Sequence, residues 1–244
     1  MKNYFLISIL ILAFNAEAQL NKFSASAEII GGIGLVTYSN DSLVPPKRRG
    51  KSRFDDLSFI NGYFSFSLRN PRYNFKTGIG YSHRDFQLNK NNLGDFFIAI
   101  FSFGSNPSDT FKIQQVKMNS QYLNVPIGFS YRLTKDKNKV VEFRVGLQVN
   151  SSFLVGQQVT VTFDPFYFTP TPQQAIEIEK EYAATERTFV ISIQPRMDLR
   201  VRIYRNMGLF TNLQPVIINL KSYNTRLVKT RSYSSASFGV YFDF

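Results

Sequence analysis

The segment Phe189–Ile203 constrains the fold of this chain more than any other, because its residues alternate in polarity from end to end. One parity of the run is apolar: Phe189, Ile191, Ile193, Pro195, Met197, Leu199, Val201 and Ile203. The other parity is polar: Ser192, Gln194, Arg196, Asp198, Arg200 and Arg202. Side chains of a strand point alternately to its two faces, so one face is apolar and the other is charged. An average strand has about five or six residues. This longer run predicts a strand that crosses a bilayer.

Seven further segments have the same pattern, which brings the total to eight: Phe23–Tyr38, Phe59–Arg69, Tyr73–Arg84, Gln121–Leu133, Val141–Asn150, Met207–Leu220 and Ser234–Phe244. The connections between them alternate in length. Short ones are 70–72, 134–139 and 204–206, and long ones are 40–56, 85–119, 162–187 and 221–233. Outer-membrane barrels have an even number of strands, short periplasmic turns and long extracellular loops. The sequence therefore predicts an all-β fold, an eight-stranded antiparallel up-and-down transmembrane β-barrel with both termini on the short-turn side.

The polar face is expected to point into the barrel. It carries glycines, including Gly80 and Gly146, which suit an eight-stranded interior that side chains only just fill. An Arg on the lipid face at mid-bilayer costs about 2–4 kcal/mol, so an outward charged face is disfavoured. We expect a structural network of interior charges: Glu142, Arg144, Arg196, Asp198, Arg200 and Arg202. A soluble barrel with the polar face outward is the alternative.

Three prolines interrupt the alternating runs, namely Pro126, Pro195 and Pro215. Each lacks a ladder donor, and a closed barrel has no edge strand, so they should lie at bulges or just beyond pairing. The strand limits around them stay open.

Two long connections contain structure of their own. The apolar run Phe96–Phe103 precedes a Gly-Ser-Asn-Pro turn and returns into Phe111–Met118, which predicts a hairpin beyond the membrane. Thr171-Pro172 followed by Gln173–Glu186 favours a short capped helix, although Ile176 and Ile178 also permit a strand.

The N-terminus reads as a secretory signal peptide. Lys2 is followed by the apolar run Tyr4–Phe14 and the small-residue site Ala16-Glu17-Ala18. Residues 1–18 are then removed near Ala18, and residues 19–244 form the outer-membrane barrel domain. The chain contains no cysteine, which excludes a lipoprotein anchor and disulfides. In a cytoplasmic protein, a net charge of +12 would suggest binding to nucleic acid. Because this chain is expected to be exported, we expect no nucleic-acid partner.

The segment Tyr122-Leu123-Asn124-Val125-Pro126-Ile127 resembles the Tyr-Leu-x-Ile/Val-Pro signature of the PorT-like outer-membrane β-barrel family, which groups with small barrels of the OmpA/OmpX type. The ending Val240–Phe244 is similar to the terminal aromatic signal that the outer-membrane assembly machinery recognises. The resemblance implies that Phe242 and Phe244 form this assembly signal. It also implies fold and location, and little about chemistry.

Candidate catalytic residues are few. His83 is the only histidine, and Asp85 lies two positions on. With Ser82 or Ser130 they could form a base, an orienting acid and a nucleophile. The alternative is a rim histidine that hydrogen-bonds a neighbour. Without cysteine or a second histidine no zinc constellation is possible, short of an all-carboxylate site, and we expect no cofactor and no metal.

Basic residues are concentrated in the first long connection, which contains Lys47, Arg48, Arg49, Lys51 and Arg53. The last long connection adds Lys221, Arg226, Lys229 and Arg231. Such side chains would pair with the phosphates of lipopolysaccharide, or else form a solvated loop.

The sequence thus predicts a structural or interaction protein in the outer membrane of a Gram-negative bacterium, with loops at the cell surface and no general pore. Its expected partners are outer-membrane lipid and lipopolysaccharide, the assembly machinery and an envelope protein. Two alternatives stay open: a lipid- or peptide-modifying enzyme that uses His83, and a soluble periplasmic carrier of apolar ligands.

Overall fold

The computed structural model describes residues 22–40, 43–69, 72–88, 97–101, 109–134, 140–166, 169–183, 188–221 and 227–244. Within them the elements follow in this order: β1 (Lys22–Tyr38), β2 (Ser52–Arg69), β3 (Tyr73–Leu88), β4 (Phe97–Phe101), β5 (Asp109–Arg132), β6 (Val141–Phe163), α2 (Pro172–Ala183), β7 (Phe189–Arg202), β8 (Met207–Lys221) and β9 (Val228–Asp243). The proposed signal peptide lies outside these residues.

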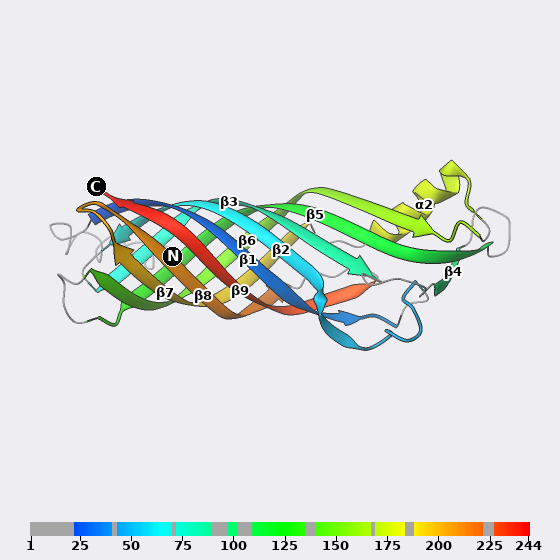
Figure 1. Cartoon of the computed structure of the whole chain (residues 1–244), viewed down its shortest axis with the longest axis horizontal. Coiled ribbons are helices and arrows are strands. Elements are labelled where there is room, and N and C mark those ends of the chain that lie inside the picture. Colours follow the sequence, from blue (N-terminus) through cyan, green and yellow to red (C-terminus); the bar gives the residue numbers. More distant parts are fainter. Residues whose placement is uncertain are drawn as a thin grey trace, which may run out of the picture.

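Eight strands close into a ring. The sheet order is β3-β2-β1-β9-β8-β7-β6-β5, and β3 also pairs with β5 (Figure 1). All pairings are antiparallel. The start of β1 and the end of β9 lie together at the short-turn end. The predicted fold class is confirmed.

The ninth strand, β4, lies beyond the ring. It pairs with β5 from Phe97↔Ile113 to Phe101↔Asp109, above the part of β5 that pairs with β3. The hairpin expected beyond the membrane is therefore confirmed for these residues. Its expected ends at Phe96 and Phe103 lie outside the described residues.

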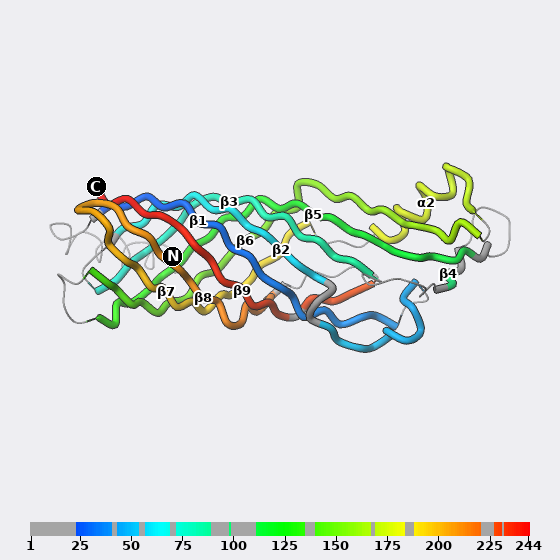
Figure 2. Tube along the Cα trace, viewed as in Figure 1, coloured from blue at the N-terminus to red at the C-terminus, as the bar shows by residue number. Residues whose placement is uncertain are grey.

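The predicted outer limits of several strands are wrong. β2 begins at Ser52 and not at Phe59, β5 begins at Asp109 and not at Gln121, and β6 continues to Phe163 and not to Asn150. The strands form an extension of the barrel at its long-loop end, which Figure 2 shows as a narrower continuation that carries α2.

The extension has an apolar core, in contrast to the polar interior predicted for the barrel. The following side chains from six strands and α2 are buried in one cluster: Val36, Tyr38, Leu57, Phe86, Leu88, Phe111, Ile113, Val116, Met118, Val159, Val161, Ile178, Tyr182 and Val228. Full burial of each large apolar side chain stabilises the fold by about 1.5–3 kcal/mol. The core explains why the strands continue where the sequence predicts loops.

Bulges mark the level at which the interior changes from polar to apolar. Between Gln121↔Gly156 and Tyr122↔Leu154, β6 contains one extra residue. Below this bulge, Val149 faces outward; above it, Val159 and Val161 face inward. An inserted residue turns the following side chains to the opposite face. β9 has a similar bulge next to Thr230.

The prolines lie where pairing is interrupted. Pro215 falls in a bulge of β8, between Gln214↔Ser235 and Ile217↔Tyr233. Pro195 faces the same interruption from β7. Pro126 lies in a gap of the β3–β5 ladder, between Thr77↔Ile127 and Gly80↔Asn124, but it pairs with Asn150 on the β6 side. This arrangement agrees with the missing donor of each proline.

Helix α2 confirms the helical interpretation of the third long connection. Thr171 and Gln174 form a capping box: the Gln174 amide donates to Thr171 Oγ1 (3.3 Å), and the Thr171 amide donates to Gln174 Oε1 (3.0 Å). Ile178 and Tyr182, four residues apart, face the core. Among the described residues no helix is both long enough and apolar enough to span a membrane.

Candidate functional site

Glu28 of β1 is the centre of the charges inside the barrel. Its carboxylate lies 2.6 Å from Lys76 Nζ of β3 and 3.7 Å from Arg196 Nη2 of β7. It also accepts hydrogen bonds from Asn212 Nδ2 (3.1 Å) and from the Ser237 hydroxyl. All these groups are buried, so the ions are compensated by one another across the bore.

The sequence-predicted interior residues lie largely where they were expected. Glu142, Arg144, Arg196, Asp198 and Arg200 are buried, and Arg202 is partly buried near the short-turn end. Arg196 pairs with Asp198 at 2.7 Å and donates to Gln148. Glu142 lies 3.2 Å from Arg144 and 3.5 Å from Arg132 of β5. These ion pairs run within a strand or to β1, β3 and β5.

Sequence reasoning missed Glu28. The signal was present, because Glu28 follows Ser24 and Ser26 on the inward parity of β1, opposite Ala25 and Ala27. Its partner Lys76, however, lies two strands away, and the pair forms across the inward face of the intervening strand β2.

The interior is filled by side chains. Two small polar voids of about 10 Å³ each lie in it, one beside Asn61 and Arg84 and one beside Lys76 and Arg196. A void of this size holds about one water molecule. A Cβ at Gly80 would overlap the ring of Tyr63, so this predicted interior glycine permits close packing.

Arg84 lies between the polar interior and the apolar core. Its guanidinium stacks over the Tyr122 ring at 4.4 Å and donates to the Tyr233 hydroxyl at 3.3 Å. Cation–π contacts of this kind stabilise a desolvated charge. Above this level the core cluster closes the bore.

His83 and Asp85 face outward from β3, at the upper edge of the apolar wall. His83 Nε2 lies 3.3 Å from Asp85 Oδ2, and both side chains are partly exposed. Ser82 faces inward, and Ser130 pairs with Asn74, nine residues along β3 from His83, or about 30 Å at the rise of a strand. The structure therefore brings neither serine to the histidine. No group of three metal-ligating side chains occurs among the described residues.

The basic segment between β1 and β2 is partly ordered by local contacts. Arg48 Nη1 donates to the Tyr38 hydroxyl at 3.0 Å, and Arg49 Nε donates to the Val44 carbonyl at 2.9 Å. Lys47, Lys51 and Arg53 are exposed. Lys229 of β9 is also exposed and pairs with Thr37, which in turn pairs with Ser52. These four exposed cations are called the basic surface below. Arg226 and the side chains of Lys221 and Arg231 lie outside the description.

The outer wall of the barrel is apolar. Ile29, Ile60, Leu213, Phe238 and Val240 are among its large exposed side chains. At the short-turn end Phe242 and Phe244, the proposed assembly signal, have ring centroids 5.1 Å apart, and Phe244 lies 5.9 Å from Phe23. This distribution supports the prediction that the apolar face points outward.

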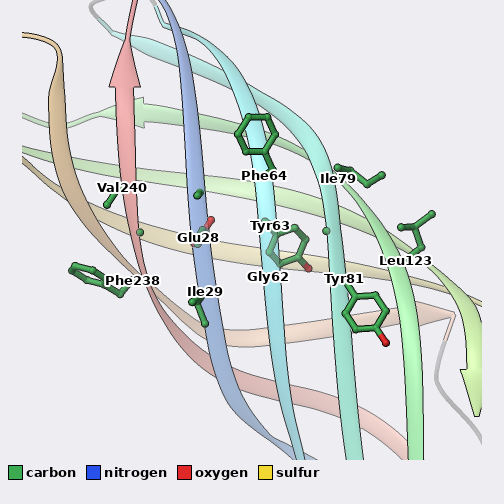
Figure 3. Close-up of a pocket in the computed structure, with 13 residues that line it drawn as sticks. Glu28, Ile29, Gly62, Tyr63, Phe64, Ile79, Tyr81, Leu123, Phe238 and Val240 are labelled. Atoms are coloured by element: carbon green, nitrogen blue, oxygen red, sulfur yellow. The ribbon is translucent and has the colours of Figure 1, made fainter.

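A groove of about 640 Å³ crosses this wall at Gly62. Figure 3 shows Ile29, Phe64, Ile79 and Tyr81 around it, each from a strand of the wall. A Cβ at Gly62 would have no neighbour within 4 Å, so the groove results from a missing side chain. This apolar hollow is on the outside of the barrel, which gives no support to a soluble carrier with an apolar interior.

Comparisons with known proteins agree with this architecture. The family model described as outer membrane protein beta-barrel domain matches residues 17–241. Among solved structures, Neisserial surface protein A has 12% identity and a TM-score of 0.44, covering 91% of this chain and 97% of that one. Ail of Yersinia pestis, in complex with the heparin analogue sucrose octasulfate, has 10% identity and a TM-score of 0.36, covering 91% and 99%. The outer membrane protease OmpT of Escherichia coli has 7% identity and a TM-score of 0.26, covering 91% and 97%. No curated protein matches the sequence.

Proposed function

Because the chain belongs to the outer membrane protein beta-barrel domain family, we propose that it is a non-porous surface barrel of the Gram-negative outer membrane whose basic surface binds the phosphates of lipopolysaccharide. The observation that supports a barrel without a pore is the apolar core, which closes the bore above a filled polar interior. A barrel closed in this way displays a folded extension and conducts little. The long-loop end is then extracellular, as in other barrels of this class.

The height of the basic surface suits lipid phosphates. On β1 the outward residue Ile33 still belongs to the apolar wall, and Thr37, which pairs with Lys229, follows four residues later. At about 3.3 Å per residue and a strand tilt of about 35–45°, Lys229 lies about 10 Å above Ile33 along the barrel axis, a height that suits contact with the lipid headgroups. Arg53 pairs with Val36 at nearly the same height. Cations at this level form charge-assisted hydrogen bonds with phosphate oxygens.

The acidic residues of helix α2 lie on the other side of the extension from the basic surface. The described acidic residues of the extension include Glu177, Glu179 and Glu181 on α2. In Figure 1, α2 and the β1–β2 connection lie on opposite sides of the extension. These three carboxylates therefore lie away from the basic surface, which favours anion binding there.

Charge reversal tests this proposal. The double variant Lys51→Glu/Arg53→Glu should bind purified lipopolysaccharide at least about thirtyfold more weakly than the unmodified barrel, because each lost cation near an anionic surface costs about 1 kcal/mol and the added carboxylates repel phosphate. The matched control Lys117→Glu/Lys180→Glu reverses two exposed cations of the extension elsewhere and should retain binding. Dephosphorylated lipopolysaccharide should bind the unmodified barrel as weakly as the variant does. Equal losses in both double variants would contradict a defined basic surface.

We also propose that, within the outer-membrane barrel family, the chain belongs to the PorT-like group. Pro126 of the Tyr122–Ile127 segment lies at the gap in the β3–β5 ladder, next to Gly78, which gives this proline a structural role. Recognition of Phe242 and Phe244 by the assembly machinery and contact with an envelope protein are likewise proposals. Removing both aromatic rings should lower the amount of folded barrel in the envelope.

We also propose that the protein is not an enzyme. The supporting observation is that the side chain of Ser82 points to the opposite face of β3 from His83, and that Ser130 lies far along the sheet from it, opposite Asn74. Replacing His83 with alanine should leave any lipid- or peptide-modifying activity of purified envelopes unchanged, and a loss of activity would revive the enzymatic alternative.

A further inference from the structure

Strand β4 leaves one backbone edge without a partner among the described residues. It is the last strand in the sheet order, and its pairing is with β5 alone. Native proteins protect such edges with charges, prolines or bulges. The sequence of β4, Phe-Ile-Ala-Ile-Phe, contains no charge and no proline, and Ile98 is 55% exposed.

In the same extension the edge of β6 is protected, unlike the edge of β4. Above Phe153 its pairing with β7 ends. There α2 packs against β6, and Glu179 Oε1 accepts a hydrogen bond from the Val161 amide at 3.4 Å. Among the described residues, one sheet edge of the extension is covered, and the other, at β4, has no partner strand and an apolar sequence. An open apolar edge is a site for strand addition.

The sequence of β4 indicates what adds to this edge, because it reads the same in both directions about Ala99. In an antiparallel pair of two copies centred there, Phe97 lies opposite Phe101, Ile98 opposite Ile100, and Ala99 opposite Ala99. Each pair joins like apolar residues, and no like charges meet. The arrangement has the two-fold symmetry of an isologous interface. We propose that β4 pairs with β4 of a second copy of this chain.

The direction of the strands determines where the second copy is. In the extension β5 runs along the long axis of the molecule, and β4 lies antiparallel beside it (Figure 1). Two antiparallel copies of β4 therefore turn the two molecules end for end. Barrels inserted in one membrane share one orientation. The paired copies thus belong to two apposed membranes, and the contact links one bacterial surface to another.

A pair of five-residue strands is a small interface, well below the roughly 1,200 Å² of total area that stable complexes bury. A single pair is therefore weak. Many copies on two facing membranes act together, and such multivalency raises the overall affinity by about 10²–10⁴. The contact is best tested between membranes, with the full chain.

Cysteine cross-linking tests both the strand and its orientation. The chain has no cysteine, so Ala99→Cys introduces a single thiol at the proposed two-fold axis. Residues directly opposite have Cβ atoms about 4.5–5.5 Å apart, within reach of a disulfide after small adjustments. Two vesicle populations, with differently tagged protein and the extension outward, are mixed under mild oxidation. Glu177→Cys on the exposed face of α2 is the matched control.

We expect disulfides between the two tags to be at least tenfold more abundant for Ala99→Cys than for Glu177→Cys. Equal cross-linking of the two variants would contradict pairing at β4. Disulfides that form only between copies with the same tag would contradict the orientation, as these copies share a membrane.

A charge on the open edge provides an independent measurement. Ile98→Lys should lower vesicle clustering, followed by light scattering, at least tenfold, whereas Ile176→Lys on α2 (52% exposed) should not. Position 98 of one copy lies opposite position 100 of the other, so mixing Ile98→Lys vesicles with Ile100→Glu vesicles should restore clustering. Circular dichroism verifies that each variant is folded. Clustering that survives Ile98→Lys would overturn the proposal, and failure of the mixture would overturn its register.

Discussion

The same strands form two regions with opposite polarity. In the barrel the interior is ionic, around Glu28 and Arg196, and the outer wall is apolar. In the extension the interior is apolar, around Phe111 and Tyr182, and the outward residues of β5, such as Lys117, are polar. The backbone ladder continues through both. The medium at the outer face, lipid or water, therefore determines which side chains face inward.

The largest effect should come from the interior of the barrel. Replacing Glu28 with alanine leaves Lys76 and Arg196 buried beside a missing anion, and removing one partner of a buried ion pair costs about 3–5 kcal/mol. Urea unfolding in detergent measures the loss. The double variant Glu28→Leu/Lys76→Met removes both ions and should recover much of the stability. If Glu28→Ala alone were nearly neutral, water would have to reach the bore freely.

The outer faces of the two regions should respond differently to the same residue. Ile29→Arg places a guanidinium on the lipid-facing wall and should cost about 2–4 kcal/mol. Thr160→Arg places it on the outward face of β6 in the extension and should change stability by less than about 0.5 kcal/mol. Unfolding from lipid vesicles gives both values. Similar costs at the two positions would remove the distinction between a lipid-facing and a water-facing wall.

A smaller effect is expected at the helix that covers the extension. Thr171→Ala removes the N-cap of α2 and should cost about 1 kcal/mol. Hydrogen exchange should show faster opening of α2 and of the β6 edge, with the strands of the barrel unchanged. Exchange that rises equally in β7 would mean that the two regions unfold as one unit.

The smallest effect should depend on pH and stay within the extension. Lys112 Nζ lies 2.9 Å from Asp164 Oδ2, and this hydrogen bond lowers the pKa of Asp164 below its ordinary value of 3.8. A carboxyl whose pKa is lower in the folded state stabilises the fold above the unfolded pKa, and this contribution is lost as the pH falls through the folded value. The protection of the amides at the ends of β5 and β6, relative to an unfolded chain at the same pH, should therefore fall between about pH 5 and about pH 3. Asp164→Asn should abolish this dependence.

Much of the barrel could be predicted from the sequence, because lipid imposes a strict alternation on each strand. The inward parity of Arg196 and the outward parity of Leu199 follow from this rule. The β4–β5 hairpin and the start of α2 follow from local turn and capping signals.

The extension could not be delimited in the same way. In β6 the apolar residues keep one parity from Val141 to Val161, and a single bulge at the membrane boundary turns them from outward to inward. In β5 there is no extra residue at that level, so even-numbered positions face inward in both regions. The apolar residues therefore change from even positions, such as Met118, to odd positions, such as Leu123, and the alternating pattern along the sequence is interrupted. A bulge depends on the neighbouring strand, and periodicity along one strand does not reveal it.

The candidate sites, too, could be predicted from the sequence only in part. Residue type and parity indicated the interior charges, but the contact of Glu28 with Lys76 across the intervening strand is a tertiary feature. His83 and Asp85 were correctly expected to share a face, since residues two apart always do in a strand. The distance of that pair from Ser130 depends on the register between β3 and β5.

The uninterrupted pairing of β5 with β6 has a mechanical consequence. From Ile113 to Arg132 the two strands stay side by side, and two bulges bend the ladder without opening it. A segment hinged on a flexible linker would sweep over the bacterial surface, whereas this one keeps a constant height. A partner bound at the end of the extension would therefore be held at a fixed distance from the bilayer.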